Sequence, residues 1–496
     1  MIAPSSPHPF AQRPVLLIAA AAGALLFSVS GRYDYVTDEL YFLAAGKYYL
    51  DWGYMDQQPL VPVLARGLDA LFPGSLPALR LPAALMVVFG VVFTALIARE
   101  LGGDRRAQVL AAAAYPLSPW LLLSGHWLMA ATLEPLQWTV IFWLLARWVR
   151  IRQQTGVFRD RLLLVAALVT ALALQTKFQV VVLVVAILVA AAAVGPRALP
   201  TRPLLWVGAL GVLLTAAPTL LWQARNGWPA LEMGTVVSDE SNRWLLLPTG
   251  LFYAGVLVGL VLCCAGAVSL LRNPQLRQFR FLGWSAVLVV VFYLLSNGRP
   301  NYLASLFGLL YAAGAVGLQL RRQRSPRPRW QWLPWPAYLL SAVVPVALLP
   351  IYPLSFLAQH PNFPSFPRLY ETGWPQLRDA VVEAYQQLPP ETRSKTVVVA
   401  SRYDLAGPLD VYGRPAGLPR VYSPHRGYWF FGSPPESAVN VLHVGEPGPL
   451  AECFRSAEQL GTVESELVNI PQGVPVTLYR DREQSWQVLW PRLRTM

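Results

Sequence analysis

About eleven long apolar stretches recur along the first 353 residues of this chain, and they constrain its fold more than any other feature. Most of them approach the ~20 residues that a helix needs to cross the hydrocarbon core of a bilayer. They lie at residues 14–30, 81–98, 107–123, 132–149, 162–175, 178–194, 203–222, 246–271, 281–296, 302–320 and 333–353. The sequence therefore predicts a polytopic α-helical membrane protein. The first stretch ends like a cleavable signal, but we expect an uncleaved span because an acidic motif follows it at once.

Charged residues alternate in sign between successive loops. Arginines concentrate in the loops around 99–106, 147–161, 197–202, 272–280 and 321–329. The intervening loops carry acids, namely Asp34, Asp38, Glu39, Asp51, Asp56, Glu134, Glu232, Asp239 and Glu240. Under the positive-inside rule the arginine loops are cytoplasmic and the acidic loops face outward. This distribution explains the net charge of +13 as topology, so we do not expect nucleic-acid binding.

The chain divides into a membrane domain at 1–353 and a soluble domain at 355–496. Within the first, residues 31–80 form a long outer loop whose segments at 39–50 and 58–72 are typical of amphipathic helices on a membrane surface. The tail loses the long apolar runs. A helix at 374–388 and strands at 397–400, 439–442 and 476–479 predict a small α/β domain outside the membrane.

The unusual polar residues gather at the outer ends of the predicted spans. The candidate site residues are Asp38, Glu39, Asp56, Gln57, Gln58, His126, Glu134, Lys177, Arg299 and Tyr302. Ionisable groups at a membrane boundary are costly unless they face water, a partner or a substrate. The clustering therefore predicts a site for a molecule with one lipid end and one polar end.

Acids together with Lys177 and Arg299 suit a lipid phosphate that carries a sugar-like head. The cations would stabilise the phosphate as a leaving group, and a carboxylate would deprotonate an acceptor hydroxyl. Alternatively, Asp38, Asp56 and Glu134 are suited to bind a divalent metal ion.

Each candidate also has a structural interpretation. An acid pair at a helix end is often a cap, and His126 suits an interfacial hydrogen bond. Lys177 suits a side chain that reaches the interface, although it is one of few lysines beside many arginines. Arg299 suits an ion pair, and Tyr302 suits the aromatic belt.

Several motifs in a fixed order resemble one known family. They are Asp-Glu-Leu-Tyr at 38–41, Trp-Gly-Tyr-Met-Asp-Gln-Gln-Pro-Leu at 52–60 and Leu-Arg-Leu-Pro at 79–82, followed by segments 98–103, 134–138, 176–178 and 299–303. This order resembles the dolichyl-phosphate-mannose–protein mannosyltransferases, glycosyltransferase family 39, over about residues 15–320. The bacterial relatives include the aminoarabinose transferases that modify lipid A. Segments 370–375 and 406–413 are similar to the tails of bacterial members.

The resemblance implies the C-type membrane glycosyltransferase fold. It also implies inverting transfer of a sugar from a polyprenyl-phosphate donor to a lipid, glycan or protein acceptor. The transfer is expected at the extracytoplasmic face of the bacterial inner membrane. The acid that begins the Asp-Glu motif is the expected base, which maps to Asp38. Gln57 stands where some relatives have a phosphate-binding lysine, which shifts that role to Lys177 and Arg299, with Tyr302 beside them.

The remaining candidates have supporting roles in this reading. Glu39 and Glu134 would orient the acceptor or hold a cation, and many relatives have Asp at the position of Glu134. The expected substrate contacts are Asp56, Gln57, Gln58 and His126.

Two other classes of protein compete with the enzyme. A transporter or flippase for polyprenyl lipids or solutes would place its polar residues near mid-membrane and often contains repeated halves. An assembly protein would use the C-terminal domain to bind a cell-wall partner. Polar residues at the outer ends of the spans, without a visible repeat, favour the enzyme.

Overall fold

The computed structural model describes residues 8–324 and 334–496 and contains two compact units. The helical unit comprises Met1–Ser30, Arg80–Leu221 and Gly234–Leu349, and the mixed unit comprises Gly31–Leu79, Trp222–Met233 and Pro350–Met496. The loop 31–79 thus shares a unit with the C-terminal residues. The division at residue 353 into a membrane domain and a soluble domain stays a prediction. The arginines at 327–329 and residue 333 lie outside the described residues.

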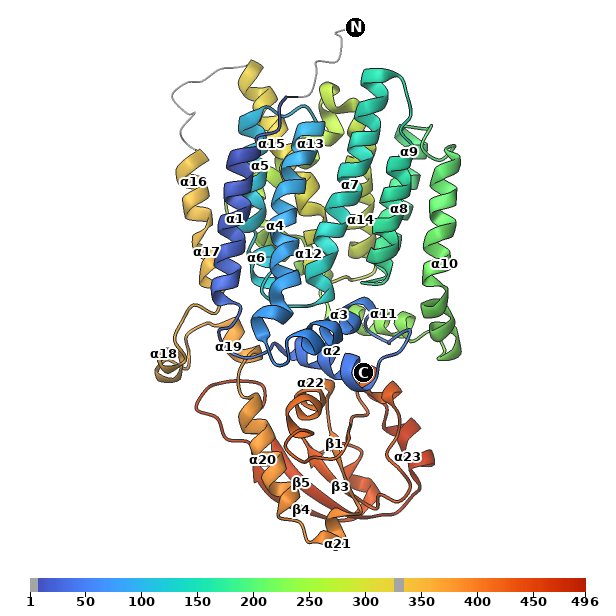
Figure 1. Cartoon of the computed structure of the whole chain (residues 1–496), viewed down its shortest axis with the longest axis vertical. Helices are drawn as coiled ribbons and strands as arrows, with labels where there is room; N and C mark the ends of the chain where they lie inside the picture. The colour runs from blue at the N-terminus through green and yellow to red at the C-terminus, as the bar shows by residue number, and fades with distance from the viewer. Residues whose placement is uncertain (1–7, 325–333) are drawn as a thin grey trace. The chain divides into compact units, whose positions relative to one another are not determined.

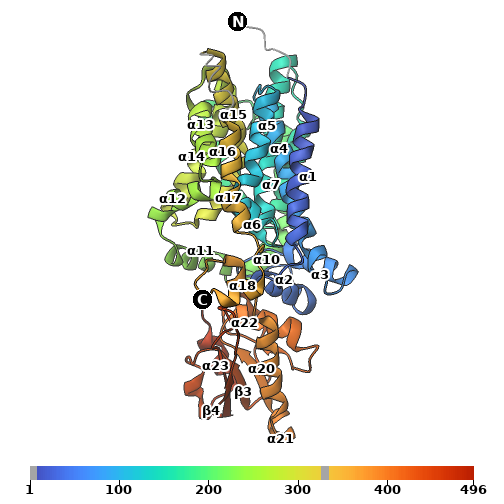
Figure 2. The same ribbon diagram turned by 90° about the vertical axis from the view of Figure 1, so that its left-hand side faces the viewer.

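Mainly apolar helices of varied length run beside one another in the helical unit (Figures 1 and 2). They are α1 (Gln12–Val29), α4 (Leu76–Glu100), α5 (Arg105–Ala114), α6 (Pro119–Ser124), α7 (Ala130–Thr155), α8 (Arg161–Leu174), α9 (Val180–Val194), α10 (Pro203–Arg225), α12 (Arg243–Ala254), α13 (Val258–Arg272), α14 (Arg280–Leu295) and α15 (Phe307–Arg324). Helix α13 packs against α15, α9 against α14, and α7 against α8. The contact between α13 and α15 is close because Gly266 and Gly314 lie against backbone carbonyls of the facing helix.

Five of the described helices are long and apolar enough to cross a membrane. They begin at Gln12, Leu76, Pro203, Pro274 and Pro300, and α12 with α13 adds a sixth if this pair, bent by 113°, counts as one span. Gly255 allows the bend with its φ of +130°. Helices α8, α9 and the segment Pro334–Ala347 are apolar but shorter. Several apolar helices are thus confirmed, whereas the count of eleven spans is not.

Ion pairs join the arginine-rich ends of α7 and α15 to acids at the end of α4 and the start of α5. Arg147 on α7 pairs with Glu100 at 3.3 Å, and Arg322 on α15 pairs with Asp104 at 2.5 Å. Glu134 lies near the start of α7, about 20 Å along the helix axis from Arg147 at 1.5 Å per residue. The acidic and basic ends of α7 are therefore far apart, as the loop alternation predicts. Which end faces the cytoplasm stays a prediction.

A five-stranded sheet in the order β2-β1-β3-β5-β4 organises the mixed unit. Its strands are β1 (Thr396–Ala400), β2 (Val421–Tyr422), β3 (Asn440–Val444), β4 (Phe454–Thr462) and β5 (Pro475–Arg482). Strand β1 is parallel to β2 and β3, while β5 is antiparallel to β3 and β4. Strands β1, β3 and β5 match the three predicted strands, and α20 (Trp374–Gln386) matches the predicted helix. Strands β2 and β4 are not among the predicted strands.

The sheet register sorts alternate residues onto two faces. Val397, Val441 and Tyr479 are in register across three strands and belong to the same buried cluster as Trp486 and Trp490 of α23 (Trp486–Leu493). Their neighbours on the opposite face are also buried, and α20 and α23 lie on opposite sides of the sheet (Figures 1 and 2). Burial on both faces explains why β1 is a nearly continuous apolar run.

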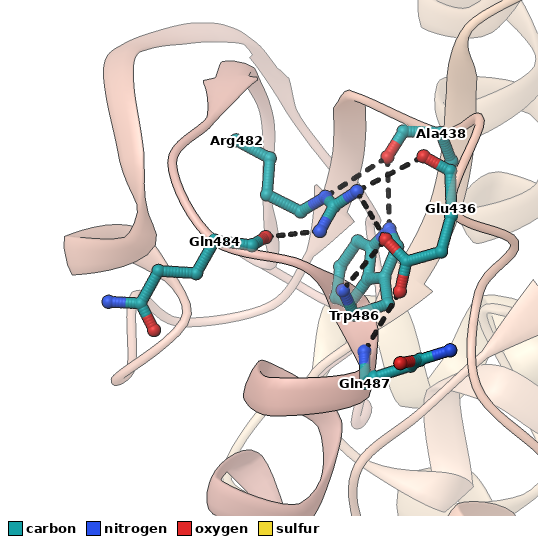
Figure 3. A network of polar contacts seen from close by, with 6 residues as sticks. All are labelled: Glu436, Ala438, Arg482, Gln484, Trp486 and Gln487. Atoms are coloured by element: carbon teal, nitrogen blue, oxygen red, sulfur yellow. Dashed lines mark hydrogen bonds and ion pairs between the residues drawn. The ribbon is translucent and has the colours of Figure 1, made fainter.

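A polar network fixes the start of α23 (Figure 3). The Glu436 carboxylate accepts the backbone N–H groups of Trp486 and Gln487 at 3.1 and 2.9 Å and pairs with Arg482 at 2.9 Å. The Trp486 indole donates to the carbonyl of Ala438 at 2.9 Å. A carboxylate at a helix N-terminus satisfies N–H groups that lack partners within the helix.

Two helices of the first loop complete the mixed unit. They are α2 (Thr37–Tyr48) and α3 (Leu60–Leu71), close to the predicted segments 39–50 and 58–72. Helix α2 packs against α22 (Tyr403–Pro408) at Gly407, where a Cβ would lie 3.0 Å from the backbone nitrogen of Tyr41. The predicted position of α2 and α3 along a membrane surface is not tested by these contacts.

Candidate active site

Glu39 fixes the start of α2, the helix that carries the Asp-Glu motif. Its carboxylate accepts the backbone N–H of Val36 at 3.0 Å, and the side chain is fully buried. An acid three residues after the N-cap that bonds back to the N-cap N–H is half of a capping box. The contact gives Glu39 a structural role, and its predicted catalytic role stays a prediction.

Asp38 belongs to a group of five side chains in the mixed unit that we term the acid cluster: Asp38, Asp56, Tyr41, Tyr403 and Arg426. The Tyr403 hydroxyl donates to Asp38 Oδ1 at 3.2 Å, and the Tyr41 hydroxyl donates to Asp56 Oδ1 at 2.8 Å. The rings of Tyr41 and Tyr403 meet edge to face at 5.2 Å. The cluster therefore places two carboxyl groups against two ordered phenol hydroxyls.

Burial raises the pKa of Asp56 to about 6, and the negative charge of Asp38 adds to this rise. The hydrogen bond from Tyr41 and the charge of Arg426 oppose it. Burial disfavours the charged form of a carboxyl, whereas a donor to the carboxylate favours it. Asp56 therefore changes protonation closer to neutral pH than an ordinary aspartate.

This shift predicts a pH-dependent stability difference for Asp56→Asn. The folded protein holds the Asp56 proton more tightly than the unfolded chain, so the stability that this proton contributes is complete below about pH 4 and is lost as the pH rises through about 6. Asparagine does not ionise and still accepts from Tyr41. In thermal unfolding, the free energy of unfolding of the variant, relative to that of wild type, should rise by about 1–3 kcal/mol between pH 4 and 7. A difference that is constant with pH would contradict the shift.

The two glutamines that follow Asp56 in the sequence are buried. Gln57 and Gln58 are 4% and 3% exposed, and neither amide atom of Gln57 has a hydrogen-bond partner among the described residues. A buried polar group without a partner costs about 1–3 kcal/mol. An unpaired buried amide near the acid cluster is suited to bind a polar ligand, and the substrate contact of Gln57 stays a prediction.

The helical unit brings together five other polar residues. The Lys177 ammonium lies 4.2 Å from the centre of the Tyr302 ring, and Tyr302 lies 5.3 Å from the ring of Tyr293. The Gln179 amide is oriented so that its nitrogen faces Glu134. This nitrogen donates to the two Glu134 carboxylate oxygens at 3.0 and 3.3 Å. Glu134 is 3% exposed and Lys177 is close enough to attract it electrostatically. Lys177, Tyr302 and Glu134 therefore form one local group, and their predicted roles stay predictions.

Two other predicted residues are engaged in local structure. Arg299 pairs with Glu240 at 2.6 Å, and both side chains are about 40% exposed. His126 is fully buried, lies against the ring of Trp127, and hydrogen bonds through Nδ1 to the carbonyl of Leu123 at 2.6 Å. These contacts agree with the structural interpretations of the two residues, and their substrate roles stay predictions.

No group of three or more His, Cys, Asp or Glu side chains suitable for a metal ion occurs among the described residues. Of the three candidate ligands, Asp38 and Asp56 lie in the mixed unit and Glu134 lies in the helical unit. The divalent metal ion therefore gains no support from the side-chain arrangement.

Tyr41, Tyr403 and Arg426, as well as Gln179 and Tyr293, are not among the predicted site residues. Tyr403 and Arg426 lie more than 360 residues after Asp38, so no local pattern indicates the contact. One backbone signal marks the loop: Arg426 has a φ of +49°, which is unusual for a residue with a side chain.

The comparisons with known proteins agree with this architecture. Residues 56–222 match the family model described as dolichyl-phosphate-mannose-protein mannosyltransferase. No curated protein sequence matches the chain.

Three solved structures share the fold at low sequence identity. ArnT from Cupriavidus metallidurans, bound to undecaprenyl phosphate, superposes with a TM-score of 0.58 at 15% identity and covers 94% of this chain and 97% of its own. The apo state of ArnT gives a TM-score of 0.57 with the same identity and coverage. The arabinofuranosyltransferase AftD from Mycobacteria gives 0.51 at 15% identity, covering 95% of this chain and 40% of AftD. These matches confirm that the chain has the C-type membrane glycosyltransferase fold, and residues 56–222 confirm the resemblance to the dolichyl-phosphate-mannose-protein mannosyltransferase family.

Proposed function

We propose that this protein transfers a sugar from a polyprenyl-phosphate donor to an acceptor hydroxyl or amine, with inversion at the anomeric carbon. The observation that carries the proposal is the fold match over 94% of the chain to a protein whose structure holds undecaprenyl phosphate. The acceptor is a lipid, a glycan or a protein. The membrane is the bacterial inner membrane, and the C-terminal residues lie outside the cytoplasm.

In this reaction Asp38 is the general base. It removes the proton from the acceptor as the acceptor oxygen or nitrogen attacks the anomeric carbon, while the bond from that carbon to the phosphate oxygen breaks and the lipid phosphate leaves. Asp38 is half-buried and is held by the Tyr403 hydroxyl at 3.2 Å. An ordered carboxylate with one oxygen fixed by a donor is suited to accept a proton in a defined direction.

Lys177 binds the donor phosphate. The pair with Tyr302, at 4.2 Å, orients the ammonium through the electron-rich face of the ring and leaves its N–H donors for an anion. Negative charge develops on the phosphate as it leaves, and a cation beside it stabilises the transition state. Glu134, held by Gln179, keeps the position of Lys177 through its opposite charge.

Replacement of Lys177 by Gln tests the phosphate contact. We expect KM for the lipid-phosphate donor to rise about tenfold or more, since a hydrogen bond to a charged group contributes about 1.5–3 kcal/mol. Steady-state kinetics over a range of donor concentrations measure the change. The matched control is Lys47→Gln, which removes the same charge from the pair with Asp69 at 2.8 Å and should leave KM unchanged. Equal effects of both changes would contradict the assignment.

The function itself is tested with purified full-length protein and a panel of radiolabelled undecaprenyl-phosphate sugars. A native membrane extract serves as the acceptor. Transfer of one label identifies the donor sugar, and the labelled product identifies the acceptor. Movement of intact donor lipid across liposome membranes without transfer would overturn the proposal in favour of a flippase.

A further inference from the structure

The Tyr403 hydroxyl makes one of the contacts between the C-terminal residues and the acid motif of the first loop. Tyr403 is the first residue of α22, which packs against α2 in the same unit. Its hydroxyl donates to Asp38 Oδ1 at 3.2 Å. We propose that Tyr403 is a positioning residue that orients the Asp38 carboxylate and stabilises its ionised form. This inference rests on the proposed function, because it assumes that Asp38 is the base.

Three neighbours fix the Tyr403 ring. It stacks on the imidazole of His425 with an interplanar angle of 6° and a centroid distance of 5.6 Å, and it meets Tyr41 edge to face. The Arg426 guanidinium lies 5.7 Å from the ring centre. A ring held on two sides cannot turn its hydroxyl away freely, so the direction of the donated hydrogen bond is set by packing.

The hydroxyl remains a donor at every physiological pH. The negative charge of Asp38, and then burial, raise the pKa of Tyr403 well above its usual value. A protonated phenol that donates to a carboxylate favours the charged form of that carboxylate. The contact therefore lowers the proton affinity of Asp38.

The backbone at Arg426 and Gly427 packs closely against the acid cluster. Arg426 adopts a left-handed φ of +49°, a conformation that is costly for a residue with a Cβ. At the next residue, Gly427, a Cβ would lie 1.9 Å from the Tyr41 hydroxyl. Strain of this kind persists where the surrounding structure requires it and gathers at functional sites.

The charges around this contact determine the direction of the expected effect. Asp56, Asp404 and Arg426 act electrostatically on Tyr403, and Arg402 pairs with Asp404. Burial, followed by the charge of Arg426, lowers the pKa of His425 to about 4, so this imidazole is neutral near pH 7. Glu39 is held in its helix cap. Tyr403→Phe removes the hydrogen bond from Tyr403 to Asp38 and changes none of these charges.

The test compares the pH dependence of transfer by wild type, Tyr403→Phe and Tyr422→Phe. For Tyr403→Phe we expect the acid limb of the kcat/KM profile to move to higher pH by about one unit and kcat to fall about tenfold, because a hydrogen bond to a charged group is lost. Tyr422 is a buried tyrosine of the same unit, and Tyr422→Phe should leave this acid limb in place. A Tyr403→Phe variant that is slower by the same factor at every pH overturns the inference.

A second measurement needs no turnover. Water-soluble carbodiimides modify protonated carboxyl groups, so the extent of labelling at Asp38, read by mass spectrometry across pH, reports its protonation directly. The labelling midpoint should move up by about one pH unit in Tyr403→Phe. An unchanged midpoint overturns the inference even if the wild type transfers sugar. A wild type that transfers no sugar overturns the proposed function instead, so the two failures are distinguished.

Discussion

Replacement of Asp38 by Asn should reduce sugar transfer about 10²- to 10⁴-fold while the protein stays folded and membrane-inserted. This range is the typical contribution of a positioned general base. Asparagine has nearly the same shape and can still accept the Tyr403 hydroxyl, so the packing of α2 against α22 is kept. The loss should appear in kcat, because the acceptor proton no longer has a base, and donor KM should change little.

Two controls make this result specific. Asp69→Asn removes a carboxylate from the same loop, at a pair with Lys47 that is partly exposed, and should retain nearly full activity. Binding of undecaprenyl phosphate to the Asp38→Asn variant should match wild type. If a folded Asp38→Asn variant transferred sugar as fast as wild type, Asp38 would not be the base.

The membrane helices and the sheet could be predicted because their signals are local. Apolar runs such as 81–98 and 203–222 determine helices within their own length, and Val397–Ala400 is an apolar β-branched run between turn residues. Strand β4 was missed because its residues Phe454–Thr462 are mostly polar and exposed on the edge of the sheet. Strand β2 has two residues and is defined only by its pairing with β1.

The candidate site was predicted in part for the same reason. Asp38 and Lys177 are conspicuous in the sequence, since an acid directly after a span and a rare lysine are both visible without a fold. Glu39 and Arg299 were conspicuous as well, but their contacts are a helix cap and an exposed ion pair. Tyr403 is one tyrosine among many, and only the packing of α22 on α2 reveals its contact.

Asp410 connects the far end of α2 to the C-terminal residues, and its side chain is fully buried. Its carboxylate accepts the hydroxyls of Tyr49 and Tyr428 at 2.8 and 3.0 Å and pairs with Arg414 at 2.8 Å. Tyr49 is the C-cap residue of α2, so this cluster holds the helix that carries Asp38 at its other end.

Asp410→Ala should destabilise the mixed unit by about 3–5 kcal/mol, because breaking a buried pair leaves the Arg414 charge uncompensated and two phenol hydroxyls without their acceptor. The Arg414 guanidinium also lies 4.1 Å from the centre of the Tyr48 ring, a contact that holds it beside the Asp410 site. Hydrogen exchange should show faster opening of α2 and α22, while the helices of the other unit exchange as in wild type.

A matched pair of variants separates loss of charge from loss of the acceptor. Asp410→Asn still offers an oxygen to the two tyrosines and should lie between wild type and Asp410→Ala in stability. Asp379→Ala, which removes an exposed acid beside Arg378, should change stability by no more than about 0.5 kcal/mol. If Asp410→Ala left the exchange of α2 unchanged, the helix would have to be held at its Asp38 end alone, by the Glu39 cap and the packing against α22.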